Sequence, residues 1–270
     1  MSKNKKFNLK NIWTMPFLSN VLILFMGIIF VFSLHTIKEI KKLDKKHIQD
    51  MKNYELSRGN KSYELPNLKK NTNMANLAGK TIVIDAGHGG FDPGTTSQDG
   101  KLIEKDITLK VATYLESYLK ETGCNIIMTR TSDKAMENAK NESEDLIKRT
   151  EITNKSNADI MISIHVNYSK NPSSQGINNY INTNLGREED KKELSNLILN
   201  SISESENWNI GETLTDNIYI LKHSNIPSVL VECGFITNLE DKKKLENDFF
   251  LQDLSMRIGT GIIKYLNKKK

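Results

Sequence analysis

A short apolar run that ends in a glycine-rich turn is the feature that most constrains how this chain folds. Residues 81–84 (TIVI) are mostly β-branched and fit a buried strand. They lead into GHGG at residues 87–90, where the glycines allow a sharp turn that exposes the imidazole of His88. Open α/β sheets bind ligands at the C-terminal ends of their strands, so His88 marks a candidate ligand site. Taken alone, His88 is equally well interpreted as a hydrogen-bonded turn residue.

Strand and helix patterns alternate from residue 81 to the C-terminus. Further strands are predicted over 125–129, 158–164, 176–181, 217–221 and 228–231. Helices are predicted between 104 and 123, over 146–157 and 188–203, and around 254–266, with a polar surface loop over 131–144. Such alternation favours a mostly parallel sheet covered by helices on both faces. We therefore predict a single α/β domain over residues 81–270.

The charge distribution argues against a nucleic-acid-binding protein. The chain has 270 residues and a net charge of +5, from 38 Lys/Arg and 33 Asp/Glu. Residues 1–80 hold 15 Lys/Arg and 5 Asp/Glu, which leaves 23 and 28 for the predicted domain. The domain is therefore net acidic and offers no basic patch interleaved with aromatic residues. The two cysteines, Cys124 and Cys233, have no CxxC spacing, which excludes a disulfide framework and a cysteine zinc site.

The N-terminal part has the pattern of a membrane anchor followed by a stalk. Residues 1–11 are basic, and the apolar run at 17–34 has 18 residues without a charge. We predict a transmembrane signal-anchor over 12–34, because the run is long enough to span a bilayer. A cleavable signal peptide is the alternative, although no A-x-A-like site is visible. Residues 35–80, rich in Lys and Asn, are predicted to form a juxtamembrane stalk or linker.

Two further residues are placed to meet His88 at one edge of the sheet. His165 follows the apolar residues of a predicted strand, and Glu104 opens the helix after the glycine turn. A catalytic zinc ion needs three protein ligands and one open position, commonly two histidines and a carboxylate. Taken alone, Glu104 is an acid in a first helical turn, where the helix dipole favours it. As a set, the three residues form a candidate zinc site.

A second carboxylate, Glu232, directly follows the buried strand at residues 228–231. A carboxylate in such a position is costly unless it is partnered or functional. At the same sheet edge as the metal, it would be placed to act as a general base on an attacking water. Because the four residues are far apart in the sequence, the complete site is an inference from the predicted topology.

Four segments in this order resemble the zinc-dependent N-acetylmuramoyl-L-alanine amidases of bacterial cell walls (amidase type 3). They are IDAGHGGFDPG at 84–94, the helix that opens with Glu104, SIHVN at 163–167 and VECGFITN at 231–238. The similarity spans residues 81–267. The resemblance implies a six-stranded sheet, one zinc ion held by His88, Glu104 and His165, and Glu232 as the catalytic residue.

The reaction that this resemblance implies is hydrolysis of the amide between N-acetylmuramic acid and L-alanine of the peptidoglycan stem peptide. Zinc would polarise the lactyl carbonyl and stabilise the oxyanion, and Glu232 would transfer the water proton to the leaving nitrogen. Other polar residues in the matching segments are interpreted as ion-pair or turn residues and not as catalytic ones: Asp92, Arg130, Arg149 and Asn167.

The organisation of the chain is similar to that of sporulation amidases that help to form muramic lactam in the spore cortex. It has one predicted membrane anchor, one catalytic domain and no wall-binding repeats. The resemblance implies that the catalytic domain lies outside the cytoplasmic membrane, in the forespore envelope for a sporulation enzyme. We also hypothesise an exported partner that targets or activates the enzyme, because no wall-binding module confines its lytic activity.

Two other functions fit the same residues. A zinc carboxypeptidase or endopeptidase acting on the stem peptide would use the same site chemistry. A membrane-anchored, non-catalytic wall-binding protein would keep the fold alone, but the four intact site residues argue against it.

Overall fold

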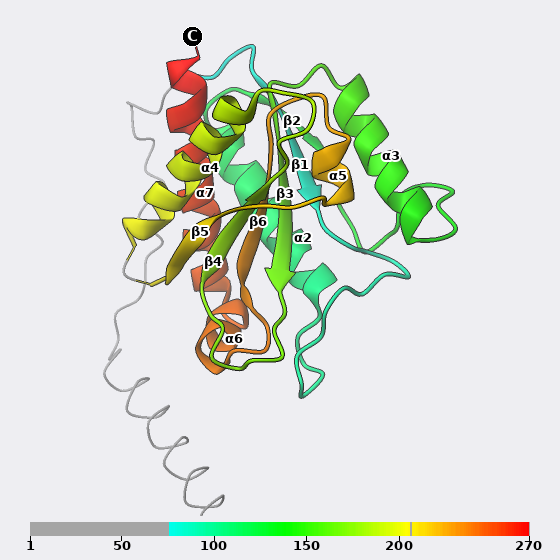
Figure 1. The fold of residues 1–270 in the computed structure, drawn as a ribbon, viewed down its shortest axis with the longest axis vertical. Coiled ribbons are helices and arrows are strands. Elements are labelled where there is room, and N and C mark those ends of the chain that lie inside the picture. The colour runs from blue at the N-terminus through cyan, green and yellow to red at the C-terminus, as the bar shows by residue number, and fades with distance from the viewer. Residues whose placement is uncertain (1–75, 206, 270) are drawn as a thin grey trace, which may run out of the picture. The chain divides into compact units, whose positions relative to one another are not determined.

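Six strands form one sheet in the order β2-β1-β3-β6-β4-β5 (Figure 1). The structure is a computed structural model that describes residues 76–205 and 207–269. All strand pairs are parallel except β4 with β6, which is antiparallel. The strands are β1 (Thr81–Ala86), β2 (Asn125–Met128), β3 (Ile160–Asn167), β4 (Ile177–Ile181), β5 (Ile210–Thr215) and β6 (Ser228–Phe235). The predicted mostly parallel α/β domain with six strands is therefore confirmed.

Helices connect these strands and cover the sheet. They are α2 (Glu104–Lys120), α3 (Glu142–Lys155), α4 (Glu188–Ser203), α5 (Tyr219–Lys222), α6 (Leu239–Leu245) and α7 (Asp248–Lys268). Helices α2 and α4 both pack against α7, whereas α3 and α5 lie side by side elsewhere on the sheet (Figure 1).

Alternate residues of the buried strands supply two separate cores. Ile82 and Ile84 of β1 belong to the larger core, which includes the buried apolar residues of α2, α4 and α7. Val83 points the other way and belongs to a smaller core with Met161, Leu230 and apolar residues of α5. This alternation follows from the two-residue period of a strand. Both faces of the sheet are therefore covered, as the apolar runs predict.

One predicted strand is wrong. Residues 217–221 were predicted to be extended, but Tyr219–Lys222 form the short helix α5, which buries Ile220 and Leu221 together. The true strand is β5, whose residues are largely exposed at the sheet edge. An edge strand with a solvated face needs few apolar residues, so its sequence carries little signal. Both residues belong to the smaller core, which suits a helical turn, because adjacent residues of a strand point to opposite faces.

Two helices also differ from the prediction, and an asparagine side chain caps the N-terminus of each. Helix α3 begins at Glu142, inside the predicted loop, because the Asn141 side chain accepts a hydrogen bond from the backbone N–H of Glu144. The short helix α6 was not predicted, and the Asn238 side chain caps it in the same way. An Asn followed three residues later by an acid is a start signal that marks α3 in the sequence.

The predicted N-terminal segments fall outside the described residues, apart from residues 76–80 at the end of the predicted stalk. Leu77 in this stretch is fully buried in the larger core. Among residues 76–205 and 207–269, no helix has the length and apolar character needed to cross a membrane. The signal-anchor over 12–34 therefore remains a prediction.

Candidate active site

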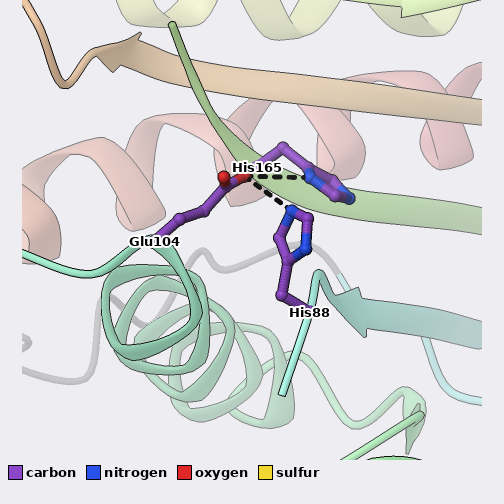
Figure 2. A group of neighbouring side chains, drawn as sticks. All are labelled: His88, Glu104 and His165. Carbon is purple, nitrogen blue, oxygen red and sulfur yellow. Dashed lines mark hydrogen bonds and ion pairs between the residues drawn. The ribbon is translucent and has the colours of Figure 1, made fainter. Parts of the chain in front are cut away.

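Three side chains from separate segments meet at the C-terminal edge of the sheet. His88 follows β1, Glu104 is the first residue of α2, and His165 lies near the end of β3. Nε2 of His88 and Nδ1 of His165 are each 3.1 Å from the same oxygen, Oε1 of Glu104 (Figure 2). One ligand atom from each residue lies within 4.8 Å of the others, which is compatible with a shared metal ion. The structure thus brings together the three predicted ligands.

Glu104 is held as a buried carboxylate. It is 2% exposed, and its oxygens accept hydrogen bonds from the backbone N–H groups of Val166 at 2.9 Å and Thr95 at 2.8 Å. Burial opposes ionisation of Glu104, but the hydrogen bonds and charges of His165 and His88 hold its pKa well below the usual range. The carboxylate therefore stays negatively charged and fixed in direction.

His88 is bonded through both ring nitrogens. Its Nδ1 lies 2.7 Å from Oδ2 of Asp92, and its Nε2 faces Glu104. Because ionised carboxylates only accept hydrogen bonds, both ring nitrogens face hydrogen-bond acceptors. Burial lowers the pKa of His88, but Glu104 and Asp92 more than offset it and raise that pKa to about 9. The centre of the cluster therefore attracts positive charge.

The cluster fits a divalent cation that takes nitrogen and oxygen ligands. Two imidazoles and one carboxylate are a ligand set of catalytic zinc sites. An ion would replace the proton shared between His88 and Glu104, while Asp92 would keep the ring in orientation as an outer hydrogen-bond partner. From the sequence, Asp92 is interpreted as an ion-pair or turn residue, and the structure identifies His88 as its ion-pair partner.

Two glycines allow the ligands to approach one another. A Cβ atom at residue 87 would lie 2.5 Å from the ring of His165. A Cβ atom at Gly94 would lie 2.6 Å from Oε2 of Glu104 and 2.7 Å from Cδ2 of His88. The glycine-rich sequence is therefore needed for packing around the ligands as well as for the turn.

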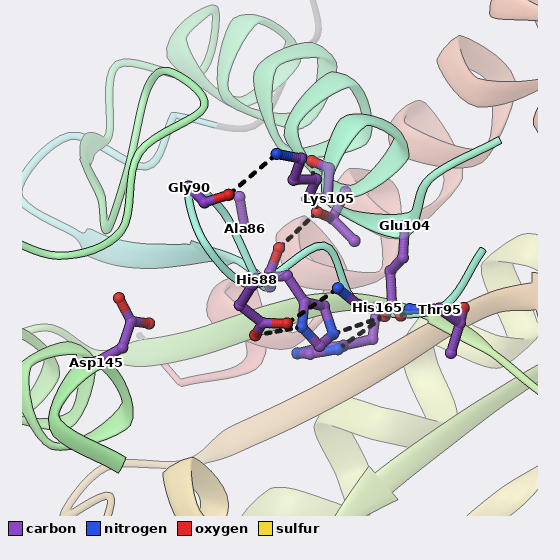
Figure 3. A network of polar contacts seen from close by, with 12 residues as sticks. Ala86, His88, Gly90, Thr95, Glu104, Lys105, Asp145 and His165 are labelled. Atoms are coloured by element: carbon purple, nitrogen blue, oxygen red, sulfur yellow. Dashed lines mark hydrogen bonds and ion pairs between the residues drawn. The ribbon is translucent and has the colours of Figure 1, made fainter. Parts of the chain in front are cut away.

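A polar network ties the glycine turn to α2. The Lys105 ammonium donates to the Gly90 carbonyl at 3.1 Å (Figure 3). It also pairs with Asp133 at 2.7 Å. The Thr108 hydroxyl donates to the Gly87 carbonyl at 2.7 Å. The residues that follow Glu104 in α2 thus hold the turn that carries His88.

Glu232 lies beside this cluster on the neighbouring strand. It is in register with His165, because β3 and β6 pair in parallel, so both side chains point to the same face of the sheet. Both also line a pocket of about 240 Å³ that includes His88. The Glu232 Oε2 atom is buried and has no hydrogen-bond partner among the described residues. A buried carboxylate oxygen without a partner marks a functional position.

The surroundings of Glu232 raise its affinity for a proton. Burial raises the pKa of Glu232 to about 7, with a further increase from Glu104 and opposing effects of His165 and His88. A carboxyl group with a pKa near neutrality can both accept and return a proton at physiological pH. Glu232 is therefore a candidate general base.

Comparisons with known proteins agree with this geometry. The family model described as N-acetylmuramoyl-L-alanine amidase matches residues 82–264. The germination-specific N-acetylmuramoyl-L-alanine amidase of Bacillus subtilis is 33% identical over 200 residues, covering 72% of this chain and 82% of the relative. The sporulation-specific N-acetylmuramoyl-L-alanine amidase of the same species is 31% identical over 191 residues, covering 70% of this chain and 69% of the relative.

A solved structure shows the same fold. The structure of the CwlD amidase from Clostridioides difficile in complex with the GerS lipoprotein has a TM-score of 0.64 and 36% sequence identity. The match covers 70% of this chain and 99% of that one. The matched family model covers more than half of the sequence and contains all four residues of the candidate site. The chain therefore belongs to the N-acetylmuramoyl-L-alanine amidases, the enzymes that cleave the bond between glycan and stem peptide in bacterial peptidoglycan.

Proposed function

We propose that this amidase depends on one zinc ion held by His88, Glu104 and His165, with Glu232 as its catalytic residue. The observation that carries this proposal is the meeting of both imidazoles at one oxygen of Glu104, with the unpartnered Oε2 atom of Glu232 on the adjacent strand. When bound, zinc would supply a Lewis acid that polarises the lactyl carbonyl and lowers the pKa of water.

The residues of the chain would carry the proton transfers. Glu232 accepts a proton from the attacking water as the oxygen adds to the lactyl carbonyl carbon. It then delivers this proton to the alanine nitrogen as the C–N bond breaks, which releases the stem peptide as an amine. Glu104 stays ionised throughout, and Asp92 keeps His88 in one orientation through Nδ1.

We further propose that the enzyme acts in formation of the spore cortex, where removal of stem peptides precedes muramic lactam formation. The germination-specific and sporulation-specific relatives support this role. The proposal includes a catalytic domain, residues 81–270, outside the cytoplasmic membrane and an anchor over residues 12–34. The complex of the CwlD amidase with a lipoprotein supports an exported partner that targets or activates this enzyme. Full activity of the purified chain on intact peptidoglycan, without other components, would exclude the activating role.

The cortex role is tested by complementation. Expressed during sporulation in Bacillus subtilis that lacks its germination-specific amidase, the full chain should restore muramic lactam, measured as muropeptides of the spore cortex. The Glu232→Gln chain, present in equal amount, should not restore it. Cortex without muramic lactam, in cells whose extracts contain the active amidase, would refute the cortex role while leaving the amidase chemistry intact.

A further inference from the structure

The residue that carries the first imidazole has an unusual backbone conformation. His88 has φ of 62°, in the left-handed region that residues other than glycine uncommonly adopt, although asparagine, aspartate and histidine do so more often than the rest. Such a conformation persists only where the surrounding structure holds it. The groups that bond the backbone carbonyls of the turn around His88 therefore help to determine where its ring points.

Arg149, a fully buried residue of α3, makes two of these contacts. Its guanidinium donates to the carbonyl of Ala86 at 2.7 Å and to the carbonyl of His88 at 2.6 Å. The same group pairs with Asp85 at 2.8 Å and with Asp145 through Nε. Held by its two carboxylate partners, Arg149 fixes the backbone of the turn in place.

A second arginine, Arg130, bonds other carbonyls of the turn but not the carbonyl of His88. Nε and one terminal nitrogen of Arg130 donate to the carbonyls of Ala86 and Gly87, each at 2.9 Å. Among the described contacts, Arg149 alone bonds the carbonyl of His88. Asp145, which holds Arg149, lies on α3 across from the cluster of His88, Glu104 and His165 (Figure 3).

We propose that Arg149 is a positioning residue for the amidase reaction. By fixing the carbonyls of Ala86 and His88, it keeps residue 88 in the left-handed conformation that turns the imidazole toward Glu104 and His165. The inference rests on the proposed metal site, because its consequence is a metal centre with correctly placed ligands. The role requires the two-pronged geometry of a guanidinium, which the single ammonium of a lysine does not reproduce.

The test compares zinc affinity in three full-length chains. Arg149→Lys keeps the positive charge beside Asp85 but cannot bond both carbonyls, so zinc affinity should fall about 10- to 100-fold. The matched control is Ser163→Ala, which removes a 2.7 Å hydrogen bond to Asp85 in the same buried network and leaves Arg149 in place. Its zinc affinity should stay within about threefold of wild type. Affinity is measured by competition with a chromogenic chelator.

A spectroscopic measurement separates ligand geometry from general stability. Cobalt replaces zinc, and the visible bands of the Arg149→Lys chain should differ in intensity and position from those of wild type, because the bands report ligand geometry. Ser163→Ala should leave the bands unchanged. If Arg149→Lys does not fold, Asp145→Asn, which loosens the guanidinium without removing it, should shift affinity and spectrum in the same direction by less.

The possible outcomes distinguish this inference from the proposed function. Unchanged zinc affinity and cobalt bands in folded Arg149→Lys or Asp145→Asn overturn the positioning role. An equal loss of affinity in Ser163→Ala also overturns it, because the effect would then come from the whole network. Failure of the wild-type chain to bind zinc refutes the proposed metal site itself.

Discussion

Glu232→Gln should lower the amidase turnover number by about 10²- to 10⁴-fold while the zinc content stays at the wild-type value. Glutamine has nearly the same shape but cannot accept a proton from water. Because Glu232 is not one of the three clustered ligands, its replacement should leave them in place. The measurement is the release of stem peptides from purified peptidoglycan, with zinc determined in the same samples.

The stability of the same variant shows whether loss of activity reflects unfolding. The pKa of Glu232 in the metal-free fold, about 7, lies above the ordinary value of 4.5. A carboxyl group whose pKa is higher in the folded state than in the unfolded state destabilises the fold once it ionises. The loss of stability begins as the pH rises above the unfolded-state pKa, and it is complete above the folded-state pKa. At about pH 8, metal-free Glu232→Gln should therefore be more stable than wild type, by about 3 kcal/mol. At about pH 4 the two should unfold alike.

Two results would contradict the assigned role of Glu232. Activity within a few-fold of wild type would show that another group accepts the proton. Loss of zinc together with activity would place Glu232 among the ligands instead. The stability comparison comes from urea unfolding of both proteins at the two pH values, after a chelator has removed the metal.

Gly94→Ala should lower zinc affinity by at least about tenfold. The new methyl group would lie 2.6 Å from Oε2 of Glu104 and 2.7 Å from Cδ2 of His88, distances that real Cβ atoms essentially never show. At least one of the two ligands must therefore move. Zinc affinity by chelator competition is the direct measurement, and amidase activity at limiting zinc should fall with it.

Gly100→Ala is a closely matched control for this substitution. Gly94 has φ of 66° and Gly100 has φ of 70°, so both variants force alanine into the left-handed region, at a cost of about 1 kcal/mol each. A Cβ atom at Gly100 meets no atom within 4 Å. Gly100→Ala should therefore carry the same backbone cost but keep its zinc affinity. Equal zinc affinities in the two variants would show that close packing at Gly94 does not matter for the site.

The fold was predictable where strands are buried on both faces. Residues 82–84 and 229–231 are continuous apolar runs, and such runs are the sequence signal of central parallel strands. Strand β5 gave no such signal, because an exposed edge strand satisfies its backbone without burying side chains. The segment that forms the short helix α5 was wrongly predicted to be a strand. Its β-branched and aromatic residues fit a strand as long as the tertiary packing is unknown.

The four central residues of the site were predictable, but their supporting contacts were not. His88, Glu104, His165 and Glu232 each fall at or near the start or end of a predicted element, and parallel strands bring those ends to one edge. The hydrogen bond from Arg149 to the carbonyl of His88 joins residues that are 61 positions apart. Hydrogen bonds from a side chain to a distant backbone carbonyl leave no periodicity in a sequence, so only the three-dimensional structure reveals them.

The most direct test of the central claim is a zinc titration of the metal-free full chain in the amidase assay. The predicted result is no release of stem peptides from the stripped chain, and activity that rises with added zinc to a plateau at about one ion per chain. Full amidase activity in a chain shown to be free of zinc and other metals would contradict the account.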